Sequence, residues 1–289
     1  MRLTPFRLHR PSSINEASQL LTDLGPDALP YCGGTELLLV AKLGLTEFTD
    51  LVDLKGIEEL HGIEANGGLR IGAAVTHREI EHAPVVRQGW PSLAEMERRV
   101  GNIRVRSVGT IGGNLCFADP HSDPATFLIA AGGTVSARGA GGLTREIPIE
   151  DFTRGPYETA LEEGELLVGV HVPRLPVASA LVHRKMSFHE RPAITVALRV
   201  EVADGAVSAV RLAVGSVGVA AQRLTEAEHA LSGAVLEDLD PRDCGEEAAR
   251  QAQPVEDSNG SIEYKRQLVR VLVGRAVADA VALAGACAA

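Results

Sequence analysis

Apolar and polar positions repeat with different periods along this chain, and each period predicts a different kind of element. Ser13 and Glu16 have the spacing of a capping box ahead of leucines at helical intervals, so a helix is expected to begin there. Short apolar runs at Ala28–Tyr31 and Asp50–Leu54 predict strands, and Glu36–Leu43 between them predicts a short helix. The beginning of the chain therefore resembles a small αβαβ unit.

The middle of the chain has shorter apolar runs that are separated by glycine. These runs predict a strand at Leu69–Ala73 and a helix that begins near Thr76. Two further helices are predicted at Pro91–Val100 and Pro124–Ala131. The glycine-punctuated tract Gly101–Asp119 is predicted to be loop or strand. From Gly132 to Phe152 the pattern predicts two strands joined by a glycine-rich turn.

After a proline-bounded linker at Val177–Ala178, the pattern changes to long strands followed by helices. Two strands, Ala193–Val202 and Ala206–Val214, are joined by an Asp204–Gly205 turn. The helices expected after them are Leu224–Leu231, Glu246–Gln253 and Ile262–Ala286. Strands followed by helices predict an α+β fold. We therefore expect three parts, with boundaries at residues 1–56, 57–176 and 177–289.

Composition excludes several classes of protein. The chain has 289 residues, enough for one large or two modest domains, and a net charge of −10, which argues against a nucleic-acid or anionic-membrane surface. The cysteines at 32, 116, 244 and 287 form no CxxC pair, so ligation of zinc or an iron–sulfur cluster by this chain alone is not expected.

The ends of the chain carry no pattern of a targeted or membrane protein. No basic region precedes an apolar core at the N-terminus, which argues against a signal peptide. The apolar tract Leu268–Ala289 contains Arg270, Arg275 and Asp279, which favours a packed helix over a membrane span. We expect a cytoplasmic protein with no membrane span.

Two glycine pairs interrupt the apolar pattern, one in "CGGTE" and one in "TIGGN". Glycine permits positive φ and close approach of a ligand, and successive amides at such a turn can bind an anion. Each pair could equally be a tight turn with no ligand. No G-x-G-x-x-G fingerprint and no Walker loop is present, so the generic nucleotide motifs do not apply.

Longer strings around these glycines identify a family. "CGGTELLL" and "TIGGNLCFADPHSDP" resemble two flavin motifs of the medium, FAD-binding subunit of molybdenum hydroxylases, the family of xanthine dehydrogenase and aerobic carbon monoxide dehydrogenase. "RLHRPSSINEASQLL", "LRIGAAVTHREIE", "IPIEDFTRGPYETALEEGELLVGVHVP" and "EAEHALSG" resemble that family in the same order. The resemblance covers essentially the whole chain.

The resemblance implies a fold of class α+β. A two-part FAD-binding domain of the vanillyl-alcohol-oxidase-like (PCMH) type would occupy residues 1–56 and 57–176 as its two subdomains. A C-terminal flavoprotein domain with an antiparallel sheet and helices would follow at 177–289.

The resemblance also implies which residues bind the cofactor. They are Leu29, Pro30, Tyr31, Cys32, Gly33, Gly34, Thr35, Glu36, Thr76, Thr110, Ile111, Gly112, Gly113, Asn114, Asp123, Leu167 and Lys185. The amides of both glycine turns would hold the diphosphate, Asp123 the polyol side, and the backbone of Leu167 the flavin. Lys185 would lie near the pyrimidine edge, where a cation stabilises reduced flavin.

Several of these residues have simpler interpretations that remain open. Thr76 and Asp123 could be helix N-caps, Lys185 an ordinary surface lysine, and Cys116 a small packed side chain. His77 and His121 could carry protons, but single histidines in polar loops are more often exposed to solvent or act as caps.

The function implied by the resemblance is that of an oxidoreductase subunit with non-covalent FAD. Electrons would pass from the molybdopterin cofactor of a large subunit through [2Fe-2S] clusters of a small subunit to this flavin, and then to an external acceptor. A dimer of heterotrimers is expected, and this chain needs no catalytic acid, base or metal of its own. The alternatives are a self-contained flavin-dependent oxidase of the vanillyl-alcohol-oxidase fold and a non-enzymatic nucleotide-binding module.

Overall fold

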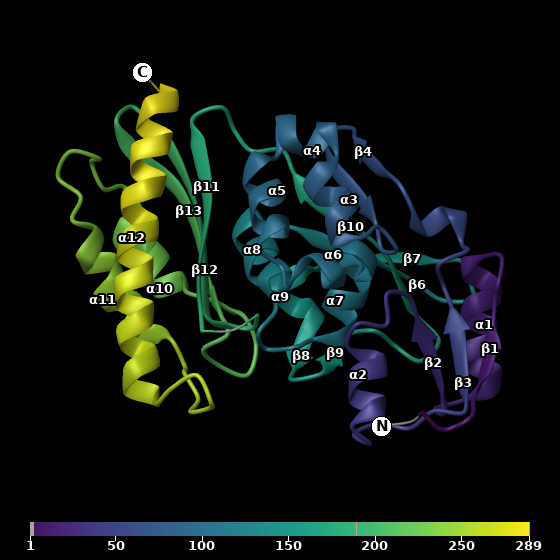
Figure 1. Ribbon diagram of the computed structural model, residues 1–289. Helices are drawn as coiled ribbons and strands as arrows, with labels where there is room; N and C mark the ends of the chain where they lie inside the picture. Colours follow the sequence, from purple (N-terminus) through teal and green to yellow (C-terminus); the bar gives the residue numbers. More distant parts are fainter. Residues whose placement is uncertain (1–2, 189, 289) are drawn as a thin grey trace. The chain divides into compact units, whose positions relative to one another are not determined.

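The chain folds into two units, and each unit combines residues from separate stretches of the sequence (Figure 1). The computed structural model describes residues 3–188 and 190–288, the last two of these by their backbone only. The first unit runs to Ala118 and resumes at Thr134–His171, whereas the second contains Asp119–Gly133 and the chain from Val172 onward. The three-part division expected from the sequence stays a prediction.

The first unit begins with a three-stranded parallel sheet in the order β1-β3-β2. Its elements are β1 (Arg7–His9), α1 (Ile14–Leu24), β2 (Ala28–Tyr31), α2 (Leu37–Lys42) and β3 (Asp50–Asp53). Ser13 caps α1 by accepting a hydrogen bond from the Glu16 amide, which confirms the predicted start of this helix. The αβαβ prediction is confirmed, and β1 is an additional strand that exists because it pairs with β3.

A five-stranded sheet forms the rest of this unit, in the order β4-β5-β10-β6-β7, and the pairs β4–β5, β10–β6 and β6–β7 are antiparallel. Its strands are β4 (Ile63–Ala65), β5 (Gly68–Gly72), β6 (Thr134–Arg138), β7 (Thr144–Pro148) and β10 (Leu166–Pro173). The short elements η1 (Glu58–Leu60), α9 (Ile149–Phe152), β8 (Thr153–Gly155) and β9 (Glu158–Thr159) connect them. The helices of this unit are α3 (His77–His82), α4 (Pro84–Gly89), α5 (Pro91–Arg98), α6 (Ile103–Val108) and α7 (Ile111–Phe117).

The prediction of loop or strand for Gly101–Asp119 is wrong, because α6 and α7 occupy most of this tract. Asn102 caps α6 by accepting from the amides of Arg104 and Val105, and Thr110 caps α7 by accepting from the Gly113 amide. The two glycines of the second pair lie inside α7, where glycine has low helix propensity. Packing against neighbouring backbone, described below, explains why they are tolerated there.

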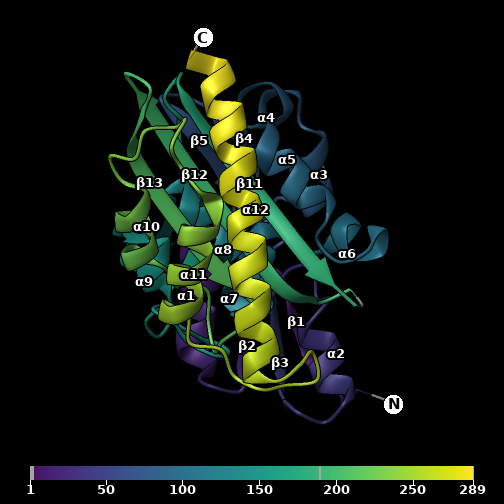
Figure 2. The same cartoon turned by 90° about the vertical axis from the view of Figure 1, so that its left-hand side faces the viewer.

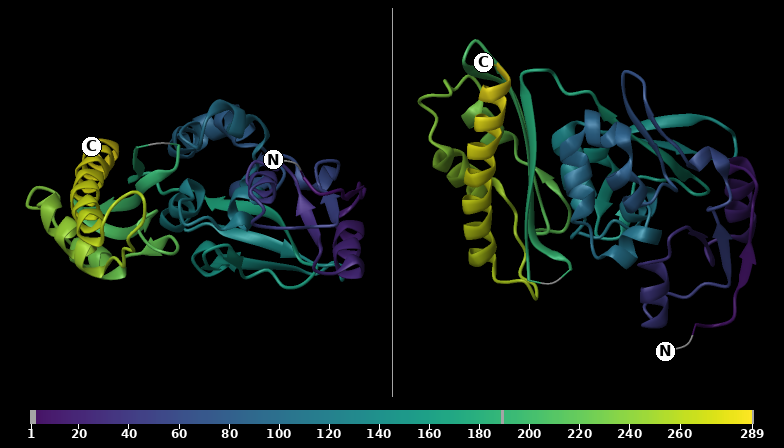
Figure 3. Two further views of the ribbon diagram at one scale, coloured as in Figure 1. Left: turned by 60° about the horizontal axis from the view of Figure 1, so that its bottom comes forward. Right: turned by 45° about the horizontal axis from the view of Figure 1, so that its top comes forward.

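The second unit is a four-stranded antiparallel sheet in the order β11-β12-β13-β14. Its strands are β11 (Ser179–Ser187), β12 (Pro192–Ala203), β13 (Ala206–Gly215) and β14 (Gln222–Arg223). The helices α10 (Thr225–Leu231), α11 (Pro241–Gln251) and α12 (Ile262–Ala288) lie together on one face, and α12 runs across the strands (Figures 2 and 3). Strands before helices and the hairpin at Asp204–Gly205 are confirmed.

The other face of this sheet is covered by α8 (Asp123–Ala131), a helix from the middle of the sequence (Figure 1). Arg199 and Arg211 donate from the sheet to the carbonyls of Ala131 and Ile129 at the end of α8. The segment that follows the second glycine pair therefore belongs to the C-terminal sheet. Within the described residues, no helix is long and apolar enough to cross a membrane.

Candidate functional site

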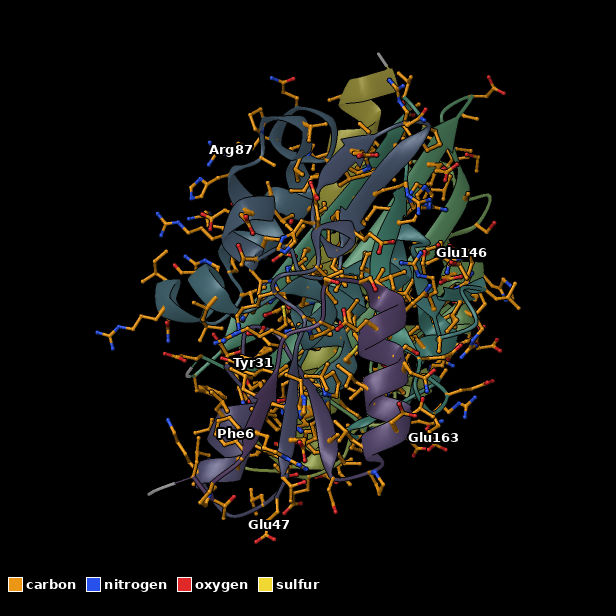
Figure 4. The ribbon with its side chains drawn as sticks, turned by 90° about the vertical axis from the view of Figure 1, so that its right-hand side faces the viewer. Phe6, Tyr31, Glu47, Arg87, Glu146 and Glu163 are labelled. Atoms are coloured by element: carbon orange, nitrogen blue, oxygen red, sulfur yellow. The ribbon has the colours of Figure 1, made fainter. Side chains whose placement is uncertain are left out.

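The first glycine pair follows directly on the end of β2, where Tyr31 is the last strand residue (Figure 4). Gly34 has φ of +69°, a conformation that favours glycine. A Cβ atom on Gly33 would lie 2.2 Å from the carbonyl oxygen of Val108 and 2.8 Å from Cα of Gly109. Gly33 is therefore glycine because the backbone of the second motif passes directly against it.

The second glycine pair is held by the strand-like segment before α3. Thr76 and Thr110 form an isolated antiparallel bridge, and the His77 amide donates to the carbonyl of Gly109. A Cβ on Gly112 would lie 2.6 Å from Cβ of Ala73 and 2.7 Å from its carbonyl oxygen. The structure thus brings the two turns together through Gly33 and Gly109, although more than seventy residues separate them.

The two turns differ in whether their backbone amides already donate hydrogen bonds within the chain. In the second turn the amide of Ile111 donates to Val75, that of Gly112 to Ala73, and those of Gly113 and Asn114 to Thr110. These four amides are used inside the chain, so they form no second face of free amides here, and the expected role of Thr110–Asn114 in holding the diphosphate stays a prediction. The amides are bonded because this segment is a capped helix packed on Ala73 and Val75, and capping consumes the first free N–H groups.

Three other amides remain available where the turns meet. Those of Gly34, Thr35 and Thr110 donate to no acceptor in the described part of the chain. The Thr35 hydroxyl lies 3.5 Å from the place that a Cβ on Gly109 would take. Free amides beside bare glycine backbone can receive an anionic group such as a diphosphate.

Side chains also connect the two turns. The Thr110 hydroxyl, which accepts from the Gly113 amide, donates to the sulfur of Cys32 and so joins the second motif to the first. Burial raises the pKa of the Cys32 thiol, and the hydrogen bond from Thr110 opposes that rise. Cys32 therefore carries a neutral thiol between the motifs.

Lys55, which the sequence did not single out, lies just after β3 and supports the first turn. Its Nζ lies 3.9 Å from the centroid of the Tyr31 ring and 3.4 Å from the carbonyl oxygen of Cys32. Asp53 pairs with the same Nζ at 2.9 Å. No local motif marks this lysine, because its role depends on the strand order.

The remaining predicted residues of the first unit lie around this meeting point or in its supporting strands. Thr76 caps α3 in a full capping box with Glu79, which confirms the simpler interpretation of this threonine. Leu167 lies buried in β10, and a backbone hydrogen bond from it reaches the sulfur of Cys116 on α7. Leu29 and Pro30 belong to β2, Glu36 begins α2, and Ile111 is buried in α7.

The second unit contains the other two predicted residues, and it pairs them. Lys185 Nζ donates to Oδ2 of Asp123 at 2.6 Å, with side chains 8% and 4% exposed. His183 Nε2 lies 3.8 Å from Oδ1 of the same carboxylate. Lys185 is therefore not a surface lysine, and the cap of α8 is Ser122, whose hydroxyl accepts from the Ala125 amide, rather than Asp123.

Both histidines of the sequence analysis contact carboxylates, and His77 is buried whereas His121 is partly exposed. His77 is 2% exposed and its Nδ1 lies 2.6 Å from Oε2 of Glu97, whose side chain is fully buried. In the second unit, His121 contacts the carboxylates of Asp119 and Asp257 at 3.2 and 3.3 Å.

No cluster of three His, Cys, Asp or Glu side chains suited to a metal occurs among residues 3–188 and 190–286. Cys32, Cys116 and Cys244 are free thiols, and the side chain of Cys287 lies outside the described residues.

Comparison with known proteins places these features in context. Residues 4–175 match the family described as the FAD-binding domain in molybdopterin dehydrogenase, and residues 184–280 match the carbon monoxide dehydrogenase flavoprotein C-terminal domain. The chain is 30% identical to the nicotine 6-hydroxylase medium subunit of Paenarthrobacter nicotinovorans, over 97% of this chain and 99% of that one. It is 32% identical to the carbon monoxide dehydrogenase medium chain of Afipia carboxidovorans, over 96% and 98%.

Similarity extends to solved structures. A chain of carbon monoxide dehydrogenase from Hydrogenophaga pseudoflava, in a form that lacks the Mo-pyranopterin moiety of its molybdenum cofactor, superimposes with a TM-score of 0.94. The match has 32% sequence identity and covers 98% of this chain and 99% of that chain. The two chains therefore share one fold over almost their whole length, including both units.

Proposed function

Because this chain belongs to the family of FAD-binding domains of molybdopterin dehydrogenases, we propose that it binds FAD non-covalently and conducts electrons through it. The electrons come from [2Fe-2S] clusters on a small partner subunit and leave to an external acceptor. The observation that carries this proposal is the contact of Gly33 with Gly109, which gathers unpaired amides from both motifs.

The residues of the first unit fit a dinucleotide diphosphate. Its negative charge suits the free amides of Gly34, Thr35 and Thr110, and the glycine backbone at 33 and 109 leaves no side chain to block approach. The residues expected from the sequence stay the proposed site, although the amides of residues 111–114 already donate within the chain. Lys55 joins the proposed site as the side chain that orients Cys32 and Tyr31.

In the second unit, Lys185 and Asp123 stay proposed cofactor-binding residues. Bound flavin supplies the ability to join one-electron input to a one- or two-electron output. The part of Lys185 is to place a positive charge that favours reduced, anionic flavin, and Asp123 holds the ammonium in position at 2.6 Å. No acid or base of this chain is required for electron transfer.

Names of the relatives support assembly with other subunits. They are medium subunits or medium chains of a nicotine hydroxylase and of carbon monoxide dehydrogenases. We infer that this chain has a large, molybdopterin-binding partner and a small, [2Fe-2S]-binding partner, in a dimer of heterotrimers in the cytoplasm.

The test is purification of the native complex from its source, followed by measurement of molybdenum, iron and flavin per chain. We expect molybdenum, iron and flavin together, with the flavin released by acid precipitation because it is not covalently bound. A preparation with flavin, without cluster-bearing partners, that oxidises a substrate alone would refute the assignment and favour the self-contained oxidase.

A further inference from the structure

Ser216 combines two unfavourable features at one buried position. It follows directly on the end of β13, its φ is +67°, and it is 1% exposed. Its hydroxyl oxygen is buried and has no hydrogen-bond partner among the described residues. Both the left-handed backbone of a residue with a side chain and an unpaired buried hydroxyl destabilise a fold. Glycine would avoid both, so the serine needs a reason that the fold does not supply.

The other side chains at positive φ have local explanations. In the described chain, the other non-glycine residues with positive φ are Ala118, Tyr157 and Asp204. Ala118 is the C-cap of α7, and Asp204 lies in the exposed turn between β12 and β13. Tyr157 is 60% exposed in the turn between β8 and β9. Helix ends and tight turns accept such a conformation, whereas Ser216 is neither a helix cap nor exposed.

The backbone around Ser216 is held from several sides, which keeps this conformation in place. The Ser216 amide donates to the carbonyl of Pro120 at 3.1 Å, and the carbonyl of the next residue accepts from the Val255 amide at 2.8 Å. A Cβ on Gly215 would lie 2.0 Å from Oγ1 of Thr126, so the end of β13 packs tightly against α8. Strained residues persist where their surroundings fix them, and they gather at functional sites.

Ser216 also adjoins the pair formed by Asp123 and Lys185. Gly215, its neighbour in the chain, lies directly opposite Thr195 of β12, and Thr195 lies directly opposite Lys185 of β11. The amide of Ser216 is bonded to the segment that leads into α8, the helix that begins with Asp123. Ser216 is thus attached both to the strand row and to the chain segment that carry the two proposed cofactor-binding residues.

Other hydroxyl groups in this part of the second unit are already used. The Thr126 hydroxyl donates to the Ser122 carbonyl at 3.3 Å and lies 3.0 Å from the hydroxyl of Thr195. The Ser122 hydroxyl accepts from the Ala125 amide. The hydroxyl of Ser216 takes no part in this set of hydrogen bonds. A buried hydroxyl that the fold leaves unpaired is suited to a polar group of a ligand.

We propose that Ser216 is a further cofactor-binding residue, whose hydroxyl forms a hydrogen bond with a polar group of FAD at the part of the site that contains Asp123 and Lys185. This inference rests on the proposed function, because it adds a residue to the same site. The strained, unpaired serine destabilises the apo-protein, and the hydrogen bond to the cofactor offsets that loss. Glycine would relieve the strain and lose the hydrogen bond.

The experiment compares two measurements on the full-length apo-protein, urea unfolding followed by circular dichroism and FAD binding followed by flavin fluorescence. Ser216→Gly removes both unfavourable features. We expect its folding equilibrium constant to rise about fivefold or more, even though glycine adds freedom to the unfolded chain. Its FAD Kd should also rise about fivefold, the scale of one neutral hydrogen bond. A merely structural serine would not give greater stability together with weaker binding.

Ser216→Ala separates the two features, because it removes the hydroxyl and keeps the strained backbone. Its FAD Kd should rise as much as that of Ser216→Gly, and its gain in stability should be smaller. Asp204→Gly is the matched control, since it replaces another residue at positive φ in the same unit, at the opposite end of β13. This variant should bind FAD like wild type.

Two results would overturn the proposal. One is wild-type FAD affinity in both Ser216 variants, which would mean that the hydroxyl binds only a buried water. The other is a loss of apo-protein stability that accompanies the loss of binding, because the hydroxyl would then serve the fold. Failure of the proposed function is distinguishable, because then the wild-type apo-protein takes up no FAD at all, and this inference fails with it.

Discussion

The two glycine pairs look alike in the sequence, yet the structure uses them differently. In the first turn, the amides of Gly34 and Thr35 remain free and Gly33 makes room for the other motif. In the second turn, Gly112 makes room for Ala73 inside the unit, and the amides from Ile111 to Asn114 are all bonded within the chain. The first pair presents donors, whereas the second pair mainly brings a helix close to a strand end.

This difference teaches that a glycine motif in a ligand-binding loop need not contact the ligand through its amides. Gly112 and Gly113 are the residues that a motif search notices, but the free amide of that segment belongs to Thr110, before the helix. Glycine inside α7 lets the helix approach Ala73, and this approach fixes where Thr110 lies.

The largest effect is expected for Gly112→Ala. Its new Cβ would lie 2.6 Å from Cβ of Ala73, in a buried position bounded by backbone, so we expect a loss of about 3 kcal/mol in the free energy of unfolding. Circular dichroism during urea denaturation measures this loss.

Gly113→Ala is the control for that variant. Gly113 is exposed, and its new Cβ would meet only the Thr110 hydroxyl at 2.9 Å. Alanine also has the higher helix propensity, so the change in stability should stay within about 1 kcal/mol. Equal losses in the two variants would contradict the distinct role of Gly112.

The next effect is expected for Gly33→Ala, and it should appear in cofactor binding. A Cβ placed 2.2 Å from the Val108 carbonyl oxygen would push the turns apart and separate the free amides. We expect the FAD Kd to rise more than about tenfold, as when one or more strong hydrogen bonds are lost. Fluorescence titration measures this Kd. Gly44→Ala is no suitable control, because Gly44 has φ of +73° and alanine there would be strained.

Gly89→Ala is a suitable control instead, since a Cβ there meets nothing within 4 Å and its φ is not positive. This variant should bind FAD like wild type. If Gly33→Ala does so too, the contact between the turns is not what organises the site.

A smaller effect is expected for Thr110→Val. The change removes the N-cap of α7 and the hydrogen bond to Cys32, which should cost about 1 kcal/mol of unfolding free energy. Thr35→Val is the matched control in the first turn, because the Thr35 hydroxyl has no hydrogen bond in the described chain. Parallel denaturation curves compare them, and a larger loss for Thr35→Val would reverse the comparison.

The smallest effect concerns the two thiols beside the glycine pairs. Burial raises the pKa of both, that of Cys116 to about 12, so neither is appreciably ionised near pH 8. Because Cys32 is only partly buried at the turn, Ellman's reagent should modify its thiol slowly. Bound FAD should slow this modification further, because the cofactor would cover the first turn. Cys116, whose thiol pKa burial raises to about 12, should react more slowly than Cys32.

Cys32→Ser assigns the slow phase in that experiment. In this variant the reaction that FAD slows should disappear, while the thiols released by denaturation remain. If FAD leaves the reaction of wild-type Cys32 unchanged, the first turn is not covered by the cofactor.

Local signals in the sequence were reliable where one residue and its near neighbours decide the outcome. The cap at Ser13, the N-cap at Thr76 and the Asp204–Gly205 hairpin all occur as predicted. The tract Gly101–Asp119 was misjudged because its glycines suggested a loop, whereas the caps at Asn102 and Thr110 start helices there. Strand β11, which carries Lys185, was not predicted either.

By itself, the sequence determined the family, most helix and strand positions, and the two motifs that hold the proposed site, because these depend on side-chain types and short spacings. Tertiary structure alone decided that Gly33 meets Gly109, that Asp123 pairs with Lys185, and that His77 is backed by Glu97. Those contacts join residues from 20 to 76 positions apart, and only the packing of whole elements brings such residues within a few ångströms.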